Sequence, residues 1–308
     1  MESHRQDAPA VAWDEESHGV EWHVELARAD LLPGRLVTGR VRIATHGSFD
    51  AKALVVSLVA TEHWKHEVTE TDAQGHPRTR VVTSTAVLMR EPVEILGAVA
   101  LAAGESREAT FELPVPPLGP ASLEADVAGV NWVLEAKLDV PGGFDSRLER
   151  PVLVHQPTAL LRAGAVPLGE FALYGPADVE ADGVSGKVEL DPVPLACGSP
   201  FSGRVVFRVP QPTELQEVRA ELRVKVEATV SGGLDEEITA WQAIIAPGAI
   251  LDGEQTIEFR GDLAPVPLPT IEVPHGRTGA TFHVILARAW APDTHLVRDV
   301  AIATTLEL

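Results

Sequence analysis

An ordered internal repeat divides this chain into two similar halves. The segment PGRLVTGRVRI at 33–43 returns as CGSPFSGRVVF at 197–207, so that Gly-Arg-Val at 39–41 is matched by Gly-Arg-Val at 203–205. Later blocks return in the same order: GES at 104–106 as GEQ at 253–255, and RPVLV at 150–154 as RDVAI at 298–302. Because turns, strands and a proline-rich loop recur in sequence, the repeat predicts two tandem domains of one fold.

The spacing of the matched blocks also locates the domain borders and an insertion. The distance between equivalent residues falls from 164 for Gly39 and Gly203 to 149 for Gly104 and Gly253, which places extra residues in the first half, within 62–100. We expect an N-terminal tail at 1–19, a first domain at 20–158 and a second domain at 159–308. The proline- and glycine-containing segment at 157–169 is the expected seam between the domains.

Hydrophobic periodicity indicates that the domains are built from strands. Apolar residues recur at every second position in short runs bounded by Gly, Pro, Asp and Asn, which is the pattern of strands with one buried face. The 24 prolines and 25 glycines leave little room for long helices, because an interior proline costs about 3 kcal/mol in a helix. Short helices at 86–104 and 212–222 stay open as alternatives. The predicted fold class is all-β, with two tandem antiparallel β-sandwich domains of immunoglobulin-like type.

Composition narrows the partners and the cellular compartment. With 45 acidic against 25 basic residues the net charge is −20, which repels nucleic acid and anionic membranes and favours a neutral or basic protein partner. The single cysteine, Cys197, excludes an internal disulfide, fits a reducing compartment and is interpreted as an unreactive thiol in a turn. The first residues of the sequence contain no apolar stretch of signal-peptide length, and no apolar run reaches the roughly 20 residues that span a bilayer. We therefore expect a cytoplasmic protein without an integral membrane segment, and a homo-oligomer stays open.

The repeated blocks resemble those of the arrestin-like family. In that family each half opens with a pG..v.G.v.v strand pair, continues with an apolar strand and a polar hairpin, and then carries a G.....F.f.lP block. The corresponding segments here are PGRLVTGRVRI (33–43), ALVVSLVATEHW (53–64), GESREATFELPVPPLGPAS (104–122) and VNWVLEAKLDV (130–140), where Trp132 replaces the usual Tyr. The second half repeats the scheme, so the resemblance covers roughly 30–308.

This resemblance implies an adaptor or scaffold without catalytic residues or cofactors. Its nearest forms are the bacterial sporulation-control arrestin-like proteins and the retromer arrestin-fold subunit. The carboxy-terminal Pro-Pro-x-Tyr ligands of eukaryotic α-arrestins have no counterpart, since Tyr174 is the single tyrosine of the chain. The basic phosphate-sensing groove of visual arrestins likewise has no matching lysine- or arginine-rich run.

Motifs for catalysis and metal binding give no competing assignment. Gly-x-Ser-x-Gly, phosphate-loop, dinucleotide and His-Glu-x-x-His patterns are all missing from the sequence. In the cluster of His63, His66 and His76, the first two have opposite strand parity, so they point to opposite faces and do not converge on a metal. The acidic runs at 14–16 and 235–237 lack the spacing of a calcium loop, and we expect them in an exposed tail and at a hairpin tip.

The inserted segment at 62–87 is the candidate binding element. Its centre, TDAQGHPRT, has turn-forming residues and no apolar side chain larger than alanine, so a solvated hairpin tip is expected. The residues that would contact a partner there are Asp72, Gln74, His76 and Arg78. A non-catalytic adaptor or scaffold that binds other proteins through loops and strand edges is the first hypothesis. A sandwich that binds carbohydrate or another small molecule, and an enzyme with an unrecognised site, are the alternatives.

Overall fold

The computed structural model describes residues 11–142, 145–163 and 177–305. The described residues are mostly in strands, with one short helix, α1 (Thr158–Arg162). The prediction of an all-β fold is confirmed. The chain divides into two compact units. Unit 1 takes in the described parts of Met1–Glu62, Thr85–Ser122 and Val130–His155, and unit 2 takes in those of His63–Ser84, Leu123–Gly129 and Gln156–Leu308.

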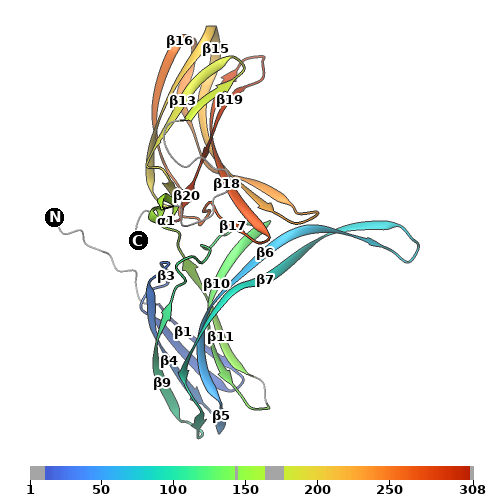
Figure 1. Ribbon diagram of the computed structural model, residues 1–308, viewed down its shortest axis with the longest axis vertical. Helices are drawn as coiled ribbons and strands as arrows, with labels where there is room; N and C mark the ends of the chain where they lie inside the picture. The colour runs from blue at the N-terminus through green and yellow to red at the C-terminus, as the bar shows by residue number, and fades with distance from the viewer. Residues whose placement is uncertain (1–10, 143–144, 164–176, 306–308) are drawn as a thin grey trace, which may run out of the picture. The chain divides into compact units, whose positions relative to one another are not determined.

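Two main sheets supply the strands of unit 1 (Figure 1). The first has the order β1-β2-β4-β9, with the bounds β1 (Val11–Ser17), β2 (Val20–Leu26), β4 (Leu36–Thr45) and β9 (Ser106–Pro114). The second has the order β3-β11-β10-β6-β7, with the bounds β3 (Asp30–Leu31), β11 (Ser146–Val154), β10 (Ala128–Asp139), β6 (Ala53–Thr71) and β7 (Pro77–Leu96). A separate pair is formed by β5 (Phe49–Ala51) and β8 (Val99–Leu101). All these pairings with a described register are antiparallel except β3 with β11.

The core of unit 1 follows from the period-two alternation of its strands. In β2, Val20, Trp22, Val24 and Leu26 are buried while the residues between them are exposed or half-buried. The indole Nε1 of Trp22 donates a hydrogen bond of 3.0 Å to Ser146 Oγ on β11, so a buried polar contact links the two sheets. Without that partner the buried indole N–H would be unsatisfied.

The expected tail at 1–19 is wrong for its described part, because β1 pairs with β2 from end to end. Side chains of β1 alternate between half-buried and exposed, with Trp13 on the half-buried side. Arg150 Nη2 on β11 forms an ion pair with Glu15 Oε2 at a distance of 2.5 Å. The acidic run at 14–16 therefore belongs to an edge strand, and its three consecutive charges hide the alternation in the sequence.

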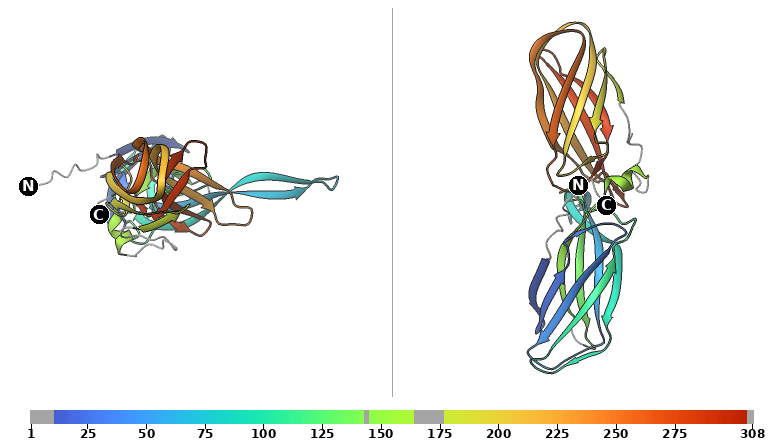
Figure 2. Two further views of the ribbon diagram at one scale, coloured as in Figure 1. Left: turned by 90° about the horizontal axis from the view of Figure 1, so that it is seen from above. Right: turned by 90° about the vertical axis from the view of Figure 1, so that its left-hand side faces the viewer.

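Unit 2 is built around two very long strands, β15 (Pro200–Ala228) and β16 (Asp235–Asp262) (Figure 2). The main sheet has the order β12-β13-β15-β18-β17, with β16 paired to β15 and β19 paired to β18. The other bounds are β12 (Ala177–Ala181), β13 (Val184–Asp191), β17 (Glu272–Val273), β18 (Gly276–Arg288) and β19 (Thr294–Val300). The short strands β14 (Leu195–Ala196) and β20 (Ile302–Ala303) pair in parallel.

An aromatic cluster fills the core of unit 2. The first part of β15 pairs with β13 and its later part pairs with β18, so the strand serves two layers. Phe201, Trp241, Phe259 and Phe282 meet there, with ring centroids 5.0 Å apart for Phe201 and Trp241 and 5.4 Å apart for Phe259 and Phe282. These rings supply a large apolar area to the core.

Neither helical alternative is present. The segment 86–104 lies mainly in β7 and β8 (Val99–Leu101), and the segment 212–222 lies in β15. Residues of the second segment pair with β16 on one side and β18 on the other. Strand pairing thus overrides the weak local signal for a helix.

Candidate functional site

The four predicted binding residues lie together at the turn of the β6–β7 hairpin, the cyan ribbon at the right of Figure 1. The carboxylate of Asp72 accepts hydrogen bonds of 2.9 Å from the backbone N–H groups of both Gln74 and His76. Arg78 Nε lies 3.5 Å from the same carboxylate, and the His76 ring lies 3.7 Å from it. Both the side chain and the backbone of Asp72 therefore hold the turn together.

Exposure distinguishes the roles of these residues. The Asp72 side chain is 16% exposed, whereas those of His76 and Arg78 are 77% and 79% exposed. Residues 73–80 are all exposed, as the polar composition predicts. Asp72 thus fixes the backbone of the turn, and His76 and Arg78 are available to a partner.

The start of the inserted segment, which contains His63 and His66, is packed, unlike the solvated tip at its centre. Both side chains are half-buried, and His63 Nε2 lies 3.2 Å from the carbonyl oxygen of Ala125. The ring of Trp64 stacks on His275 with 4.0 Å between centroids.

Backbone hydrogen bonds fix the same segment to other parts of unit 2. Lys65 N–H donates to Val127 (2.8 Å), and Leu234 N–H donates to the carbonyl of Lys65 (3.1 Å). Glu67 N–H donates to Gly232 at 2.8 Å, in the turn between β15 and β16. A hairpin anchored at its base in this way can hold its outer turn in a defined position.

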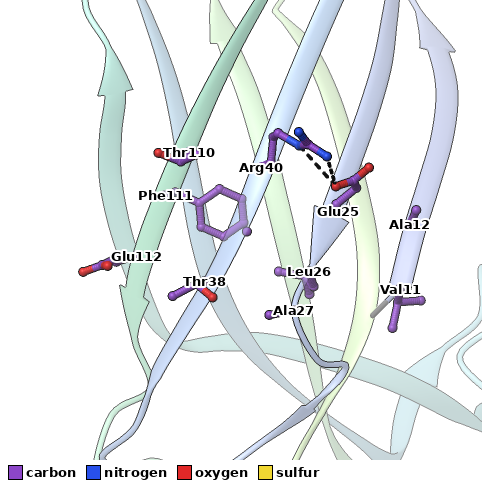
Figure 3. Close-up of a pocket in the computed structure, with 11 residues that line it drawn as sticks. Val11, Ala12, Glu25, Leu26, Ala27, Thr38, Arg40, Thr110, Phe111 and Glu112 are labelled. Carbon is purple, nitrogen blue, oxygen red and sulfur yellow. Dashed lines mark hydrogen bonds and ion pairs between the residues drawn. The ribbon is translucent and has the colours of Figure 1, made fainter. Parts of the chain in front are cut away.

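A hollow of about 570 Å³ lies on unit 1 around Gly39 of β4 (Figure 3). Phe111 is the partner of Gly39 in the neighbouring strand β9, and a Cβ on Gly39 would overlap its ring. Arg40 Nη2 donates to Glu25 Oε2 at 2.5 Å beside the hollow. Hydrogen bonds with His23 and Arg40 lower the pKa of Glu25, so the charges of Glu25 and Arg40 are already paired with each other.

Unit 2 contains the counterpart of this arrangement. Gly203 pairs with Phe259 on β16, and a Cβ on Gly203 would overlap that ring as well. Arg204 Nε donates to Glu189 Oε2 at 2.9 Å, which reproduces the charge pair of unit 1. Because both halves keep the glycine, the ring and the ion pair, we assign the hollow to the fold and not to a ligand.

A small apolar pocket of about 190 Å³ in unit 2 includes Cys197, Leu263, Leu268 and Ile302. Burial raises the pKa of the Cys197 thiol, which keeps the thiol protonated at neutral pH. The pocket offers no charged group beside the sulfur that would favour a thiolate.

A second charged groove, in unit 2, was not predicted from the sequence. It has a volume of about 670 Å³ and lies over β15, β18 and β19, with Lys225, Glu227, Arg277, His283 and Asp299 among its lining residues. These residues are far apart in the sequence, and each strand contributes only one or two of them. No local motif joins them, since only strand pairing brings them together.

No group of three or more His, Cys, Asp or Glu side chains is placed to hold a metal ion in the part of the chain that the structure describes. His66 Nδ1 is buried without a hydrogen-bond partner there, while His63 contacts the Ala125 carbonyl, so the two imidazoles do not share a site.

Comparison with known proteins finds a family that matches the first half of the chain. The family described as SpoOM protein matches residues 18–163, which contain the blocks at 33–43 and 104–122. No curated protein matches the chain. Among the described residues, no helix is long and apolar enough to cross a membrane. The family match confirms that the chain resembles the bacterial sporulation-control proteins with an arrestin-like fold.

Proposed function

We propose that this protein is a non-catalytic, cytoplasmic adaptor that binds a protein partner through the turn of the β6–β7 hairpin. The observation that carries the proposal is the Asp72-centred turn, which is exposed and yet internally hydrogen-bonded. A binding element that is already ordered loses less conformational entropy on association than a loose loop does. The anchored base of the hairpin, from Trp64 to Glu67, supports the same role.

The family match supports a regulatory setting for this adaptor, since the similar proteins are sporulation-control proteins. Two further features favour protein binding over catalysis. The exposed groups at the tip, His76 and Arg78, are suited to hydrogen bonds and ion pairs, and the half-buried Cys197 thiol is protonated. Arg78 would contribute a planar, multidentate donor to the interface.

The test compares two double variants of the full chain as bait in the native cell. His76→Ala with Arg78→Ala removes the exposed groups of the tip. Arg35→Ala with Arg42→Ala is the control, because both arginines are exposed in unit 1 and lie in or beside β4. Proteins captured by the parent and by the control, but not by the tip variant, are then purified and titrated against all three chains.

A purified partner should bind the parent and the control with equal affinity and the tip variant at least tenfold more weakly. Equal affinity for all three chains would contradict the proposal. Asp72→Ala adds a second measure, because it loosens the turn without removing His76 or Arg78. Its affinity should fall between those of the parent and the tip variant.

A further inference from the structure

The groove of unit 2 arises where strand β18 changes its neighbour. The short strand β17 pairs with β18 at Gly276 and Arg277, whereas β19 begins to pair with it at Ala280. Between these points Gly279 is paired only to Lys225 on β15 among the described residues. Because glycine has no side chain, the outer face of the sheet is hollow at this position, with a volume of about 670 Å³. Ligand-binding pockets typically have about 300–1,000 Å³.

The charges around this groove are unevenly paired. Glu227 forms ion pairs of 2.5 Å with both Lys225 Nζ and Arg277 Nε, so these two cations already have a carboxylate partner within the protein. Glu272 and Asp299 also line the groove, and neither makes an ion pair within the described residues. The carboxylates of Glu272 and Asp299 thus have no cationic partner in the described residues, whereas Lys225 and Arg277 are both paired with Glu227.

Strand register separates these two carboxylates. Asp299 lies opposite Thr281, whereas Glu272 lies opposite Arg277 at the other side of Gly279. Arg277 lies next to Glu272 in the sheet, but its guanidinium contacts Glu227 on β15. A ligand that satisfied both carboxylates would therefore need two separate cationic groups and would cross the floor at Gly279.

A third polar group in the groove has an unused atom. His283 Nε2 lies 2.9 Å from Thr281 Oγ1, and His283 Nδ1 is buried without a hydrogen-bond partner among the described residues. Burial and the charge of Arg223 lower the pKa of His283, so the ring is neutral at pH 7 and does not repel a cation.

We propose that this groove binds an extended basic segment of a protein partner, with two arginines that reach Glu272 and Asp299. Arginine fits because its planar guanidinium pairs with a carboxylate through two parallel hydrogen bonds. A second copy of this chain does not fit, since it would bring a further net charge of −20 to the groove. The inference builds on the proposed adaptor function but uses a surface separate from the residues of the hairpin turn.

The probe is a fluorescein-labelled peptide, Gly-Arg-Val-Arg-Val-Arg-Gly, titrated with the purified full chain in 150 mM salt. Glu272→Gln with Asp299→Asn should weaken its binding at least tenfold. Asp252→Asn with Glu254→Gln is the matched control, because it removes the same charge from exposed positions on and beside the part of β16 that pairs with Arg208 and Val209. The control should bind the peptide within twofold of the parent.

Three results would overturn the inference. The first is that the parent chain does not bind the peptide. The second is an equal loss of peptide affinity in both double variants, which would mean that the peptide is attracted to the whole acidic surface. The third is that spermidine displaces the labelled peptide at the same concentration as unlabelled peptide does. Gly279→Thr separates shape from charge, because it fills the floor without altering net charge. It should weaken peptide binding while thermal unfolding stays cooperative.

The hairpin variant His76→Ala/Arg78→Ala distinguishes the two proposals. It should bind the basic peptide as tightly as the parent does, whatever happens to capture of the hairpin partner. Retained peptide binding with unchanged partner capture would contradict the proposed function and support the groove. Lost peptide binding in this variant would contradict the groove as a separate site.

Discussion

The ring of Phe259 occupies the space that a Cβ on Gly203 would take. The two residues are direct partners on β15 and β16, and Phe111 covers Gly39 in the same way between β4 and β9. The repeated glycine in the sequence is therefore a packing requirement of each half. A large buried ring replaces the missing side chain of the neighbouring strand.

Gly203→Ala should lower the free energy of unfolding by about 1–3 kcal/mol, because the added methyl group forces the Phe259 ring out of its packed position. Gly47→Ala is the control, since a Cβ there meets no atom within 4 Å and its backbone needs no left-handed conformation. Urea denaturation measures both variants. Adding Phe259→Leu to Gly203→Ala should recover part of the loss, and additive losses in the double variant would show that the ring is not the cause.

The features that could be predicted from the sequence are those that depend on neighbouring residues. Alternation predicted the strands, because each strand buries one face and exposes the other. The composition around Asp72 predicted an exposed turn, because turn residues act through their own backbone. The strand β1 was missed, since its acidic run interrupts the alternation that marks a strand.

The groove in unit 2 could not be predicted in this way. Glu272, Lys225 and Asp299 come from three strands that are distant in the sequence, and their proximity depends on strand register. The hollow at Gly279 depends on where β17 ends and β19 begins, which no periodicity indicates. A site formed across several strands can be predicted only when the strand pairing is known, whereas a turn can be predicted from its own residues.

Trp241→Ala should cost about 1–3 kcal/mol of stability, because the half-buried indole stacks on Phe259 and Phe282 and meets Phe201 edge-on. Trp290→Ala is the matched control, since its side chain is fully exposed, and it should change stability by less than about 0.5 kcal/mol. Thermal unfolding of the two variants gives the comparison. Equal effects would contradict the description of the cluster as the core of unit 2.

Replacing residues 71–79 by a short Gly-Ser turn should leave the melting temperature nearly unchanged. Most of the replaced residues are exposed, and a twofold change in loop length alters closure entropy by only about 0.6 kcal/mol. Replacing Trp64 by Ala should be more costly, because that residue stacks on His275 at the anchored base. A large loss on shortening the tip would show that the tip packs against other residues.

His155 should make the parent chain less stable in acid than the variant His155→Gln. Burial lowers the pKa of His155 despite the carboxylate of Asp30 at 3.6 Å, and Arg28 adds to the lowering. The unfolded chain, with a histidine pKa of about 6.5, then binds the proton first as pH falls. Denaturant titrations of both chains between pH 7.5 and 5.5 should show the parent losing stability relative to the variant. A constant difference would mean that His155 titrates alike in both states.

Comparison of the two halves identifies a buried arginine, Arg298, that has no carboxylate partner within the described residues, whereas its counterpart Arg150 has one. Arg150 and Arg298 occupy equivalent positions in RPVLV and RDVAI, and Arg150 pairs with Glu15 on β1. In the second half the equivalent of Glu15 is Val179 on β12, at the spacing that relates Gly39 to Gly203. Arg298 is 4% exposed and donates to the Val188 carbonyl at 2.8 Å, while its Nε has no hydrogen-bond partner among the described residues.

Arg298→Met should therefore leave the free energy of unfolding unchanged or raise it by up to about 4 kcal/mol. Burial disfavours the charged guanidinium and so lowers the pKa of Arg298, and methionine keeps the apolar stem without the charge. Arg150→Met is the control, because its partly exposed ion pair contributes at most about 1 kcal/mol. Urea denaturation at pH 7 decides between the two arginines. A loss above about 2 kcal/mol for Arg298→Met would show that the bond to the Val188 carbonyl outweighs the burial of an unpaired charge.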